Sequence, residues 1–198
     1  MPAQRTPGRP REFDLDSALE AALQTFWKRG YESTSLDDLT EAMGISRSSF
    51  YAAFGSKHDV LIKSLTRYSD RGFATLSAIA VTASTPQRAV RAIVEAIAGY
   101  TTSDAGCFLV NTITELAPQD PQVTAIGEAQ VDRLERLIAT SLAACDPTGR
   151  TSTKDTAGKS RALLSLAFGA TLLRKASLPK ERISAMLTAA FDLIPAEA

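Results

Sequence analysis

The residues best suited to chemistry form a polar cluster in the stretch SRSSFYAAFGSK, residues 46–57. The cluster consists of Arg47, Ser48, Ser49 and Tyr51. An arginine bonds a guanine edge or a phosphate, a serine hydroxyl bonds either, and a tyrosine is long enough to reach a phosphate. On a helix these side chains lie largely opposite Phe50 and Phe54, which are four residues apart and share one side. The spacing therefore predicts a helix that reads DNA with one face and packs with the other.

Two short helices and a tight turn are needed to hold this cluster, and the preceding residues predict them. Ser35, followed three residues later by Asp38, is a capping box, and apolar residues at helical spacing predict a helix over 36–43. Gly44 tolerates the left-handed conformation that ends a helix, and Ser46 is typical of the cap of the next one. We therefore expect a helix-turn-helix whose second helix enters the major groove.

A third helix start adds a candidate phosphate site. Ser56 and Asp59 are expected to cap it, with Lys57 in its first turn, and a helix start attracts anions. Thr34 has two open interpretations: its hydroxyl bonds a phosphate, or it is a second cap candidate beside Ser35. The full predicted DNA-binding set is Arg9, Arg11, Thr34, Ser46, Arg47, Ser48, Ser49, Tyr51 and Lys57.

Residues 1–12, MPAQRTPGRPRE, are too polar and too rich in proline to fold alone. One interpretation is a disordered tail. The other is an arm whose arginines, Arg5, Arg9 and Arg11, approach the minor groove beside the reading helix. Deleting residues 1–11 is expected to weaken operator binding if the arm interpretation is right, whereas an unchanged affinity would leave only a tail.

The overall charge is unusual for a DNA-binding protein. The chain has 22 basic and 22 acidic residues, so its net charge is zero, whereas phosphate contacts usually demand a basic domain. The charges are segregated, however: residues 1–11 and 42–57 contain arginine or lysine and no acid. We therefore expect modest nonspecific affinity for DNA with a shallow salt dependence.

Helical spacing extends through the rest of the chain, and no alternating run demands a strand. We predict an all-α protein of about nine helices, with the first helix between Asp14 or Asp16 and Gly30 and a long helix over about 56–80. Later helices are expected from Pro86, Ala105, Pro121 and Thr156, and a last one from Pro179 to Ile194. The predicted domains are 1–57, the arm and helix-turn-helix, and 58–198, a helical domain for effector binding and dimerisation.

Several classes of function are disfavoured. The chain has no glycine-rich phosphate loop or nucleophile elbow, so no enzyme is expected. His58 is the only histidine and has no cluster of ligands around it, so we expect no metal and no cofactor. No signal peptide or 18-residue apolar span is present, which predicts a cytoplasmic protein that does not engage membranes. Reduced thiols are expected there for Cys107 and Cys145; no basic residue near Cys107 in sequence would lower its pKa, which favours a structural thiol, and a redox sensor is the alternative.

Polar and aromatic residues within apolar surroundings are candidates for a small-molecule pocket. They are Phe73, Tyr100, Cys107, Phe108, Asn111, Thr112 and Glu115. The alternative is that they only pack helices or face solvent. Glu115 is the most informative of them, because a buried carboxylate needs a partner.

The last two helices carry broad apolar faces that could form a four-helix bundle with a second copy. The predicted interface consists of Leu164, Phe168, Thr171, Leu172, Met186, Leu187 and Phe191. A homodimer presents two reading heads, so we expect a roughly palindromic operator.

The reading region resembles the TetR/AcrR family of bacterial regulators over about residues 14–65. The family's pattern is carried by Leu39, Ala42, Gly44, Ile45, Ser46, Phe50, Tyr51, Phe54, Ser56 and Lys57. The resemblance implies a ligand-responsive transcriptional regulator, most often a repressor, that dimerises through its last two helices. Ala52 and Ala53 depart from the family, which often has a histidine here, so no site preference is carried over. An alternative is a DNA-binding protein whose second domain serves only dimerisation or a protein partner.

Overall fold

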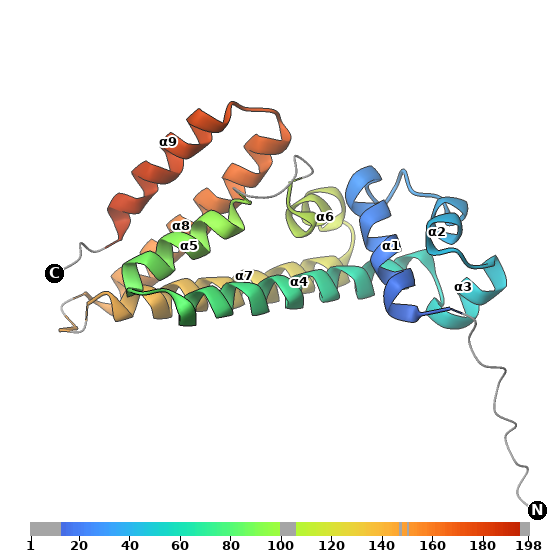
Figure 1. The fold of residues 1–198 in the computed structure, drawn as a ribbon, viewed down its shortest axis with the longest axis horizontal. Helices are drawn as coiled ribbons and strands as arrows, with labels where there is room; N and C mark the ends of the chain where they lie inside the picture. The colour runs from blue at the N-terminus through green and yellow to red at the C-terminus, as the bar shows by residue number, and fades with distance from the viewer. Residues whose placement is uncertain (1–12, 100–105, 147, 150, 195–198) are drawn as a thin grey trace, which may run out of the picture. The chain divides into compact units, whose positions relative to one another are not determined.

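The computed structural model describes residues 13–99, 106–146, 148–149 and 151–194, and within these ranges the regular structure is entirely helical (Figure 1). The prediction of an all-α fold of about nine helices is confirmed. The helices are α1 (Leu15–Arg29), α2 (Leu36–Met43), α3 (Arg47–Phe54), α4 (Lys57–Thr82), α5 (Pro86–Ile97), α6 (Phe108–Leu116), α7 (Pro121–Ala144), α8 (Thr153–Lys175) and α9 (Lys180–Ala190), followed by the 3₁₀ turn Phe191–Leu193.

The chain divides into two compact units, Met1–Ser64 and Leu65–Ala198. The sequence suggested a division between residues 57 and 58, at the start of α4. In the structure the first two turns of α4 belong to the first unit, to which they contribute the buried Val60 and Leu61. The first unit is called the head below.

In the head, helices begin where a polar side chain caps the first free amide groups. The Asp14 carboxylate accepts a hydrogen bond from the Ser17 amide at 2.9 Å and so starts α1. At the end of α2, Gly44 takes the left-handed conformation (φ +65°), which a side chain would oppose. The turn that redirects the chain into α3 therefore depends on this glycine.

Buried aromatic and aliphatic side chains hold the head together. α1 packs on α2, and α2 packs on α3. Phe50 and Leu39 are fully buried, and Leu23 and Phe26 are 2% exposed. Burying one such side chain contributes roughly 1.5–3 kcal/mol, so the apolar back of α3 is a major part of what fixes its orientation.

In the second unit, α7 packs against α5 and α8, and α8 packs against α9, with α6 against α7 and α8 (Figure 1). Ile93, Ile138 and Leu163, from α5, α7 and α8, are fully buried in its core. Gln130 and Arg133 of α7 reach Ser69 and Asp70 of α4, which places these two helices side by side.

A buried arginine closes the carboxyl end of α5. One Arg174 nitrogen, Nη1, donates to the Ala98 carbonyl at 2.7 Å and also to the Gly99 carbonyl. A cation suits a helix end where carbonyl groups lack partners. Gly99 has φ +67°, and a Cβ added there would lie 2.5 Å from the Arg174 guanidinium. The close approach therefore requires glycine.

Three helix boundaries differ from the sequence prediction. α6 begins at Phe108 rather than Ala105, and residues 100–105 lie outside the described ranges. α8 begins at Thr153 rather than Thr156, because Ser152 caps it by accepting from the Asp155 amide at 3.1 Å. α9 stops at Ala190, and the predicted helix continues only as the 3₁₀ turn.

No helix among the described residues is long and apolar enough to cross a membrane. In the same part of the chain, no three His, Cys, Asp or Glu side chains are grouped as metal ligands would be. Cys107 and Cys145 are not joined by a disulfide; burial raises the pKa of the Cys145 thiol, which favours its protonated form.

Candidate nucleic-acid interface

The outward face of α3 carries the polar cluster that the sequence predicted. The Tyr51 side chain is 56% exposed and that of Arg47 is 63% exposed, while Ser48 is also exposed. On the opposite side Phe50 is fully buried and Phe54 is 5% exposed, with ring centroids 5.9 Å apart. α3 therefore packs with its aromatic residues and presents its hydrogen-bonding residues outward.

Arg47 is engaged by a carboxylate from the preceding helix. Its Nη2 lies 2.6 Å and 2.7 Å from the two Asp37 oxygens, and its Nε lies 2.9 Å from Oδ1. The Asp37 carboxylate raises the pKa of Arg47, so the guanidinium stays charged. The sequence predicts Arg47 on this face but does not reveal its pairing with Asp37, called the clamp below, since the two residues are ten positions apart across the turn. A nucleic-acid contact through Arg47 Nε or Nη2 would have to displace Asp37.

Three serines form a hydroxyl network at the start of α3. The Ser46 hydroxyl accepts from the Ser49 amide at 3.1 Å, which makes it the helix cap. The same hydroxyl donates to Ser49 Oγ at 3.0 Å and lies 2.9 Å from Ser48 Oγ. Ser46 thus orients the hydroxyls of Ser48 and Ser49. Of these two, Ser48 is the more exposed.

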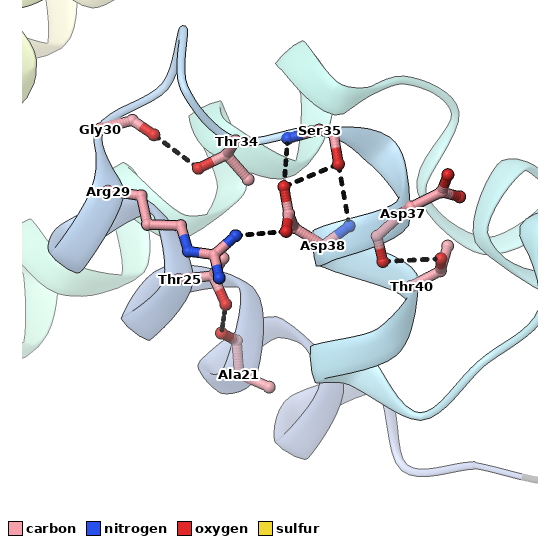
Figure 2. Close-up of polar contacts among 9 residues, drawn as sticks. All are labelled: Ala21, Thr25, Arg29, Gly30, Thr34, Ser35, Asp37, Asp38 and Thr40. Atoms are coloured by element: carbon pink, nitrogen blue, oxygen red, sulfur yellow. Dashed lines mark hydrogen bonds and ion pairs between the residues drawn. The ribbon is translucent and has the colours of Figure 1, made fainter.

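Thr34 was wrongly included among the DNA-binding candidates. It is fully buried, and its hydroxyl donates to the Gly30 carbonyl at 2.6 Å (Figure 2). Because its hydroxyl is already bonded inside the head, it is not placed to bond a phosphate. Its role is to fix the chain between α1 and α2.

The predicted capping box of α2 is present and is tied to α1 (Figure 2). The Ser35 hydroxyl accepts from the Asp38 amide at 3.1 Å, and Asp38 Oδ2 accepts from the Ser35 amide at 2.8 Å. The other carboxylate oxygen pairs with Arg29 of α1. One aspartate therefore starts α2 and fastens it to the helix on which it packs.

This carboxyl predicts an acid-sensitive contribution to the stability of the head. Its hydrogen bonds with Ser35, together with Arg29, lower the pKa of Asp38 from 3.8 to about 2. The folded state thus keeps the carboxylate charged at pH values where the unfolded chain is protonated. The stabilisation is fully present above about pH 4 and is lost as the pH falls through about 2.

Asp38→Asn is therefore expected to lower the urea midpoint of unfolding at pH 7, and its difference from the original chain should shrink between pH 4 and pH 2. The fluorescence of Trp27, the single tryptophan, reports on the head because it lies in α1. A difference that stays constant down to pH 2 would contradict this assignment.

Lys57 lies at the first position of α4, where its ammonium is 4.2 Å from the centroid of the Tyr31 ring. The Tyr31 ring in turn meets His58 edge to face at 6.5 Å. Because a cation over an aromatic face is held there electrostatically, Lys57 is positioned at the start of the helix. Arg9 and Arg11 of the predicted arm lie outside the described residues.

The second unit contains a cavity of about 200 Å³ between parts of α4, α5, α7 and α8 and the start of α6. Its apolar wall includes Leu76, Ile97, Leu109, Leu134 and Phe168, and its polar groups include Tyr68, Ser69, Thr75, Cys107 and Gln130. The Tyr68 hydroxyl lies 3.5 Å from Cys107 Sγ and donates to it.

Of the predicted effector set, only Cys107 lines this cavity. Phe108 is buried and packs edge to face on Tyr68, and the buried Thr112 hydroxyl donates to the Phe108 carbonyl, so neither side chain lines this cavity. Three others do not line the cavity: Phe73, which lies against Arg133, and the half-buried Asn111 and Glu115. Tyr100 lies outside the described residues. Ser69 and Gln130 were missed, because helical periodicity alone does not reveal which buried polar groups share a cavity.

The predicted dimer residues differ in how exposed they are. Leu164, Thr171, Leu187 and Phe191 are buried within this chain's own second unit. Phe168 is half-buried and lines the cavity. Leu172 and Met186 are 51% and 39% exposed.

Known proteins share both the sequence and the fold. A sequence model described as "Bacterial regulatory proteins, tetR family" matches residues 18–63. The HTH-type transcriptional repressor ComR of Escherichia coli (strain K12) is 38% identical over 68% of this chain and 66% of its own length, just under two thirds. The uncharacterized HTH-type transcriptional regulator YezE of Bacillus subtilis (strain 168) is 30% identical over 75% of this chain and 78% of its own.

A solved structure matches over nearly the whole length. It holds a cysteine-substituted form of the TetR family transcriptional regulator CifR in complex with a 26-bp double-stranded operator DNA. The TM-score is 0.81 at 30% identity, and the match covers 94% of this chain and 100% of CifR.

Proposed function

This chain belongs to the TetR family of bacterial transcriptional regulators, and we propose that it is a repressor that binds a roughly palindromic operator as a homodimer and leaves it when a small molecule binds. As a member of this family it is a DNA-binding regulator and not an enzyme. We further propose that it acts in the cytoplasm, where the bacterial chromosome lies.

The observation that carries this proposal is the division of α3 into two faces. Phe50 and Phe54 are buried, while Arg47, Ser48 and Tyr51 are exposed together. A recognition helix needs this arrangement, because base edges and phosphates are reached only by side chains on one exposed side. The binding of CifR to operator DNA supports the same use of the head here.

Selection from a random pool of duplex DNA tests the proposal. The purified chain is expected to enrich a sequence with two related half-sites in inverted orientation. Enrichment of a single half-site would contradict the dimeric mode. If no sequence is enriched above nonspecific retention, the repressor proposal is overturned.

Exposed apolar and small residues of α8 and α9 support the proposed homodimer. Leu172 and Met186 offer apolar surface, and Gly169 has open space around the position of a Cβ. Small side chains let two helices approach closely, which favours packing against a second copy. Leu172 and Met186 both belong to the interface set predicted from the sequence.

Leu172→Glu is expected to shift the dimer toward monomer by about tenfold or more, because a dimer would bury an unpaired carboxylate. Analytical ultracentrifugation at micromolar concentration measures the shift. Val81→Glu is the matched control, since Val81 is 85% exposed on α4. A dimer equally stable in both variants would contradict the proposed surface.

The cavity of the second unit supports release by a small molecule. It joins an apolar wall to a few polar groups, which is the usual make-up of a ligand site. A ligand changes DNA affinity only if it binds the free and DNA-bound states differently. Screening small molecules for loss of the protein–operator complex tests this proposal, and a second unit that serves only dimerisation would yield no such molecule.

A further inference from the structure

We infer that the cavity of the second unit takes a small, neutral molecule that carries a hydroxyl group on an apolar body. This inference rests on the proposed function and adds the chemical class of the effector. It is carried by two atoms of residues in the cavity wall, Ser69 Oγ and Gln130 Oε1. Both are buried, and neither has a hydrogen-bond partner within the described part of the chain.

The Gln130 amide is held in one orientation. Gln130 is 5% exposed, and its Nε2 donates to the Ser69 carbonyl at 3.2 Å. Turning the amide over would bring two acceptor oxygens together, so Oε1 is the atom left without a donor. Ser69, also 5% exposed, contributes a hydroxyl that both donates and accepts. An acceptor and a donor therefore belong to two residues that are bonded to each other.

A hydroxyl group on the ligand satisfies both atoms at once. Its O–H donates to Gln130 Oε1, and its oxygen accepts from the Ser69 hydroxyl. An ether oxygen can only accept, and an ammonium group can only donate. Unpaired polar atoms in a buried wall are costly, so a ligand that pairs both is favoured over one that pairs neither.

The remaining wall favours a neutral ligand. None of the described lining residues carries a charged side chain. Burial and the neighbouring Cys107 raise the pKa of Tyr68, so its phenol remains uncharged. A carboxylate or ammonium in this wall would lie without a counter-ion, which is strongly unfavourable.

The cavity volume limits the size of the apolar body. Engineered apolar cavities of about 150 Å³ in another protein hold benzene. At about 200 Å³, this cavity fits a ligand slightly larger than a single six-membered ring. Leu76, Leu134 and Phe168 provide its apolar contacts.

Arg174 is the buried cation that could suggest an anionic ligand instead. Its Nη1 already donates to the Ala98 and Gly99 carbonyls at the end of α5, and it does not line the cavity. The neutral class is therefore favoured, and an anion is one outcome of the test.

Calorimetry on the full chain without DNA compares three probes of similar size: phenol, toluene and benzoate. Phenol is expected to bind, toluene to bind about tenfold more weakly, and benzoate to give no measurable binding. Toluene as tight as phenol would overturn the role of the hydroxyl. Benzoate tighter than phenol would overturn the neutral class.

Two variants locate the contact. Ser69→Ala and Gln130→Met are each expected to weaken phenol about threefold to tenfold and to leave toluene unchanged. Ser64→Ala is the matched control, because Ser64 Oγ is also buried without a partner on α4 but lies outside the cavity wall. Far-UV circular dichroism checks that each variant keeps its helix content. Phenol affinity unchanged in both cavity variants would overturn the inference.

Operator binding in the presence of phenol separates this inference from the proposed function. Phenol that binds at Ser69 and Gln130 without changing operator affinity would support the ligand class and overturn the cavity as the effector site. Release of the operator by a screened molecule, with no binding of phenol, would overturn the ligand class and leave the regulator proposal standing.

Discussion

Phe50→Ala is expected to abolish operator binding by unfolding the head, whereas Tyr51→Ala is expected to weaken binding and leave the head folded. The two residues are neighbours on α3 but face opposite ways: Phe50 is fully buried and Tyr51 is 56% exposed. Truncating a buried phenylalanine costs about 3–5 kcal/mol. A unit as small as the head buries a limited core, so this loss is a large part of its stability.

Trp27 fluorescence separates loss of folding from loss of contact. Because the only tryptophan lies in α1, its emission follows the head and not the second unit. Phe50→Ala should show unfolded emission, while Tyr51→Ala should keep native emission and lose about threefold to tenfold in operator affinity.

Phe50→Leu serves as the control, since it keeps most of the buried volume and should retain both folding and binding. The arrangement of α3 would be contradicted if Phe50→Ala stayed folded and bound the operator normally, or if Tyr51→Ala unfolded the head.

The helices of the head could be predicted because their ends are fixed by hydrogen bonds between residues that are close in sequence. Ser35 with Asp38, Ser46, and Ser56 with Asp59 each bond within three residues along the chain, so their spacing is visible in the sequence. Gly44 likewise marks the turn by its own conformational freedom. The two faces of α3 follow from the four-residue spacing of Phe50 and Phe54.

The sequence does not reveal contacts that form only when helices pack together. The burial of Thr34 follows from the loop between α1 and α2, not from its hydroxyl. Leu187 and Phe191 belong to an apolar stripe, but a stripe does not tell whether a residue packs on its own chain or on a second copy. Ser69 and Gln130 are 61 residues apart, and only the packing of α4 on α7 joins them.

If Arg47 contacts DNA as we propose, its pairing with Asp37 makes the affinity for DNA depend on a residue outside α3. While Asp37 holds Arg47 by three short contacts, a phosphate or base edge must compete with a carboxylate for the same guanidinium. Both side chains are well exposed, so water and salt weaken the pair and the exchange is accessible. Asp37 therefore restrains Arg47 in the free protein and opposes its transfer to DNA.

Arg47→Ala is expected to lower operator affinity about tenfold to one-hundredfold, because it removes a charged contact from each head. Asp37→Ala is expected to raise affinity about twofold to fivefold by releasing Arg47 from its competitor. Fluorescence anisotropy with a labelled operator, at one fixed salt concentration, measures both changes.

The double variant decides how Asp37 acts. If the carboxylate works through Arg47, then adding Asp37→Ala to Arg47→Ala changes operator affinity little, because no guanidinium remains to be released. If it works by general repulsion of phosphates, the affinity rises equally with or without Arg47. Glu41→Ala removes another exposed carboxylate from α2 and measures that general effect. Equal gains from Glu41→Ala and Asp37→Ala, kept in the Arg47→Ala background, would show that the clamp has no role in DNA recognition.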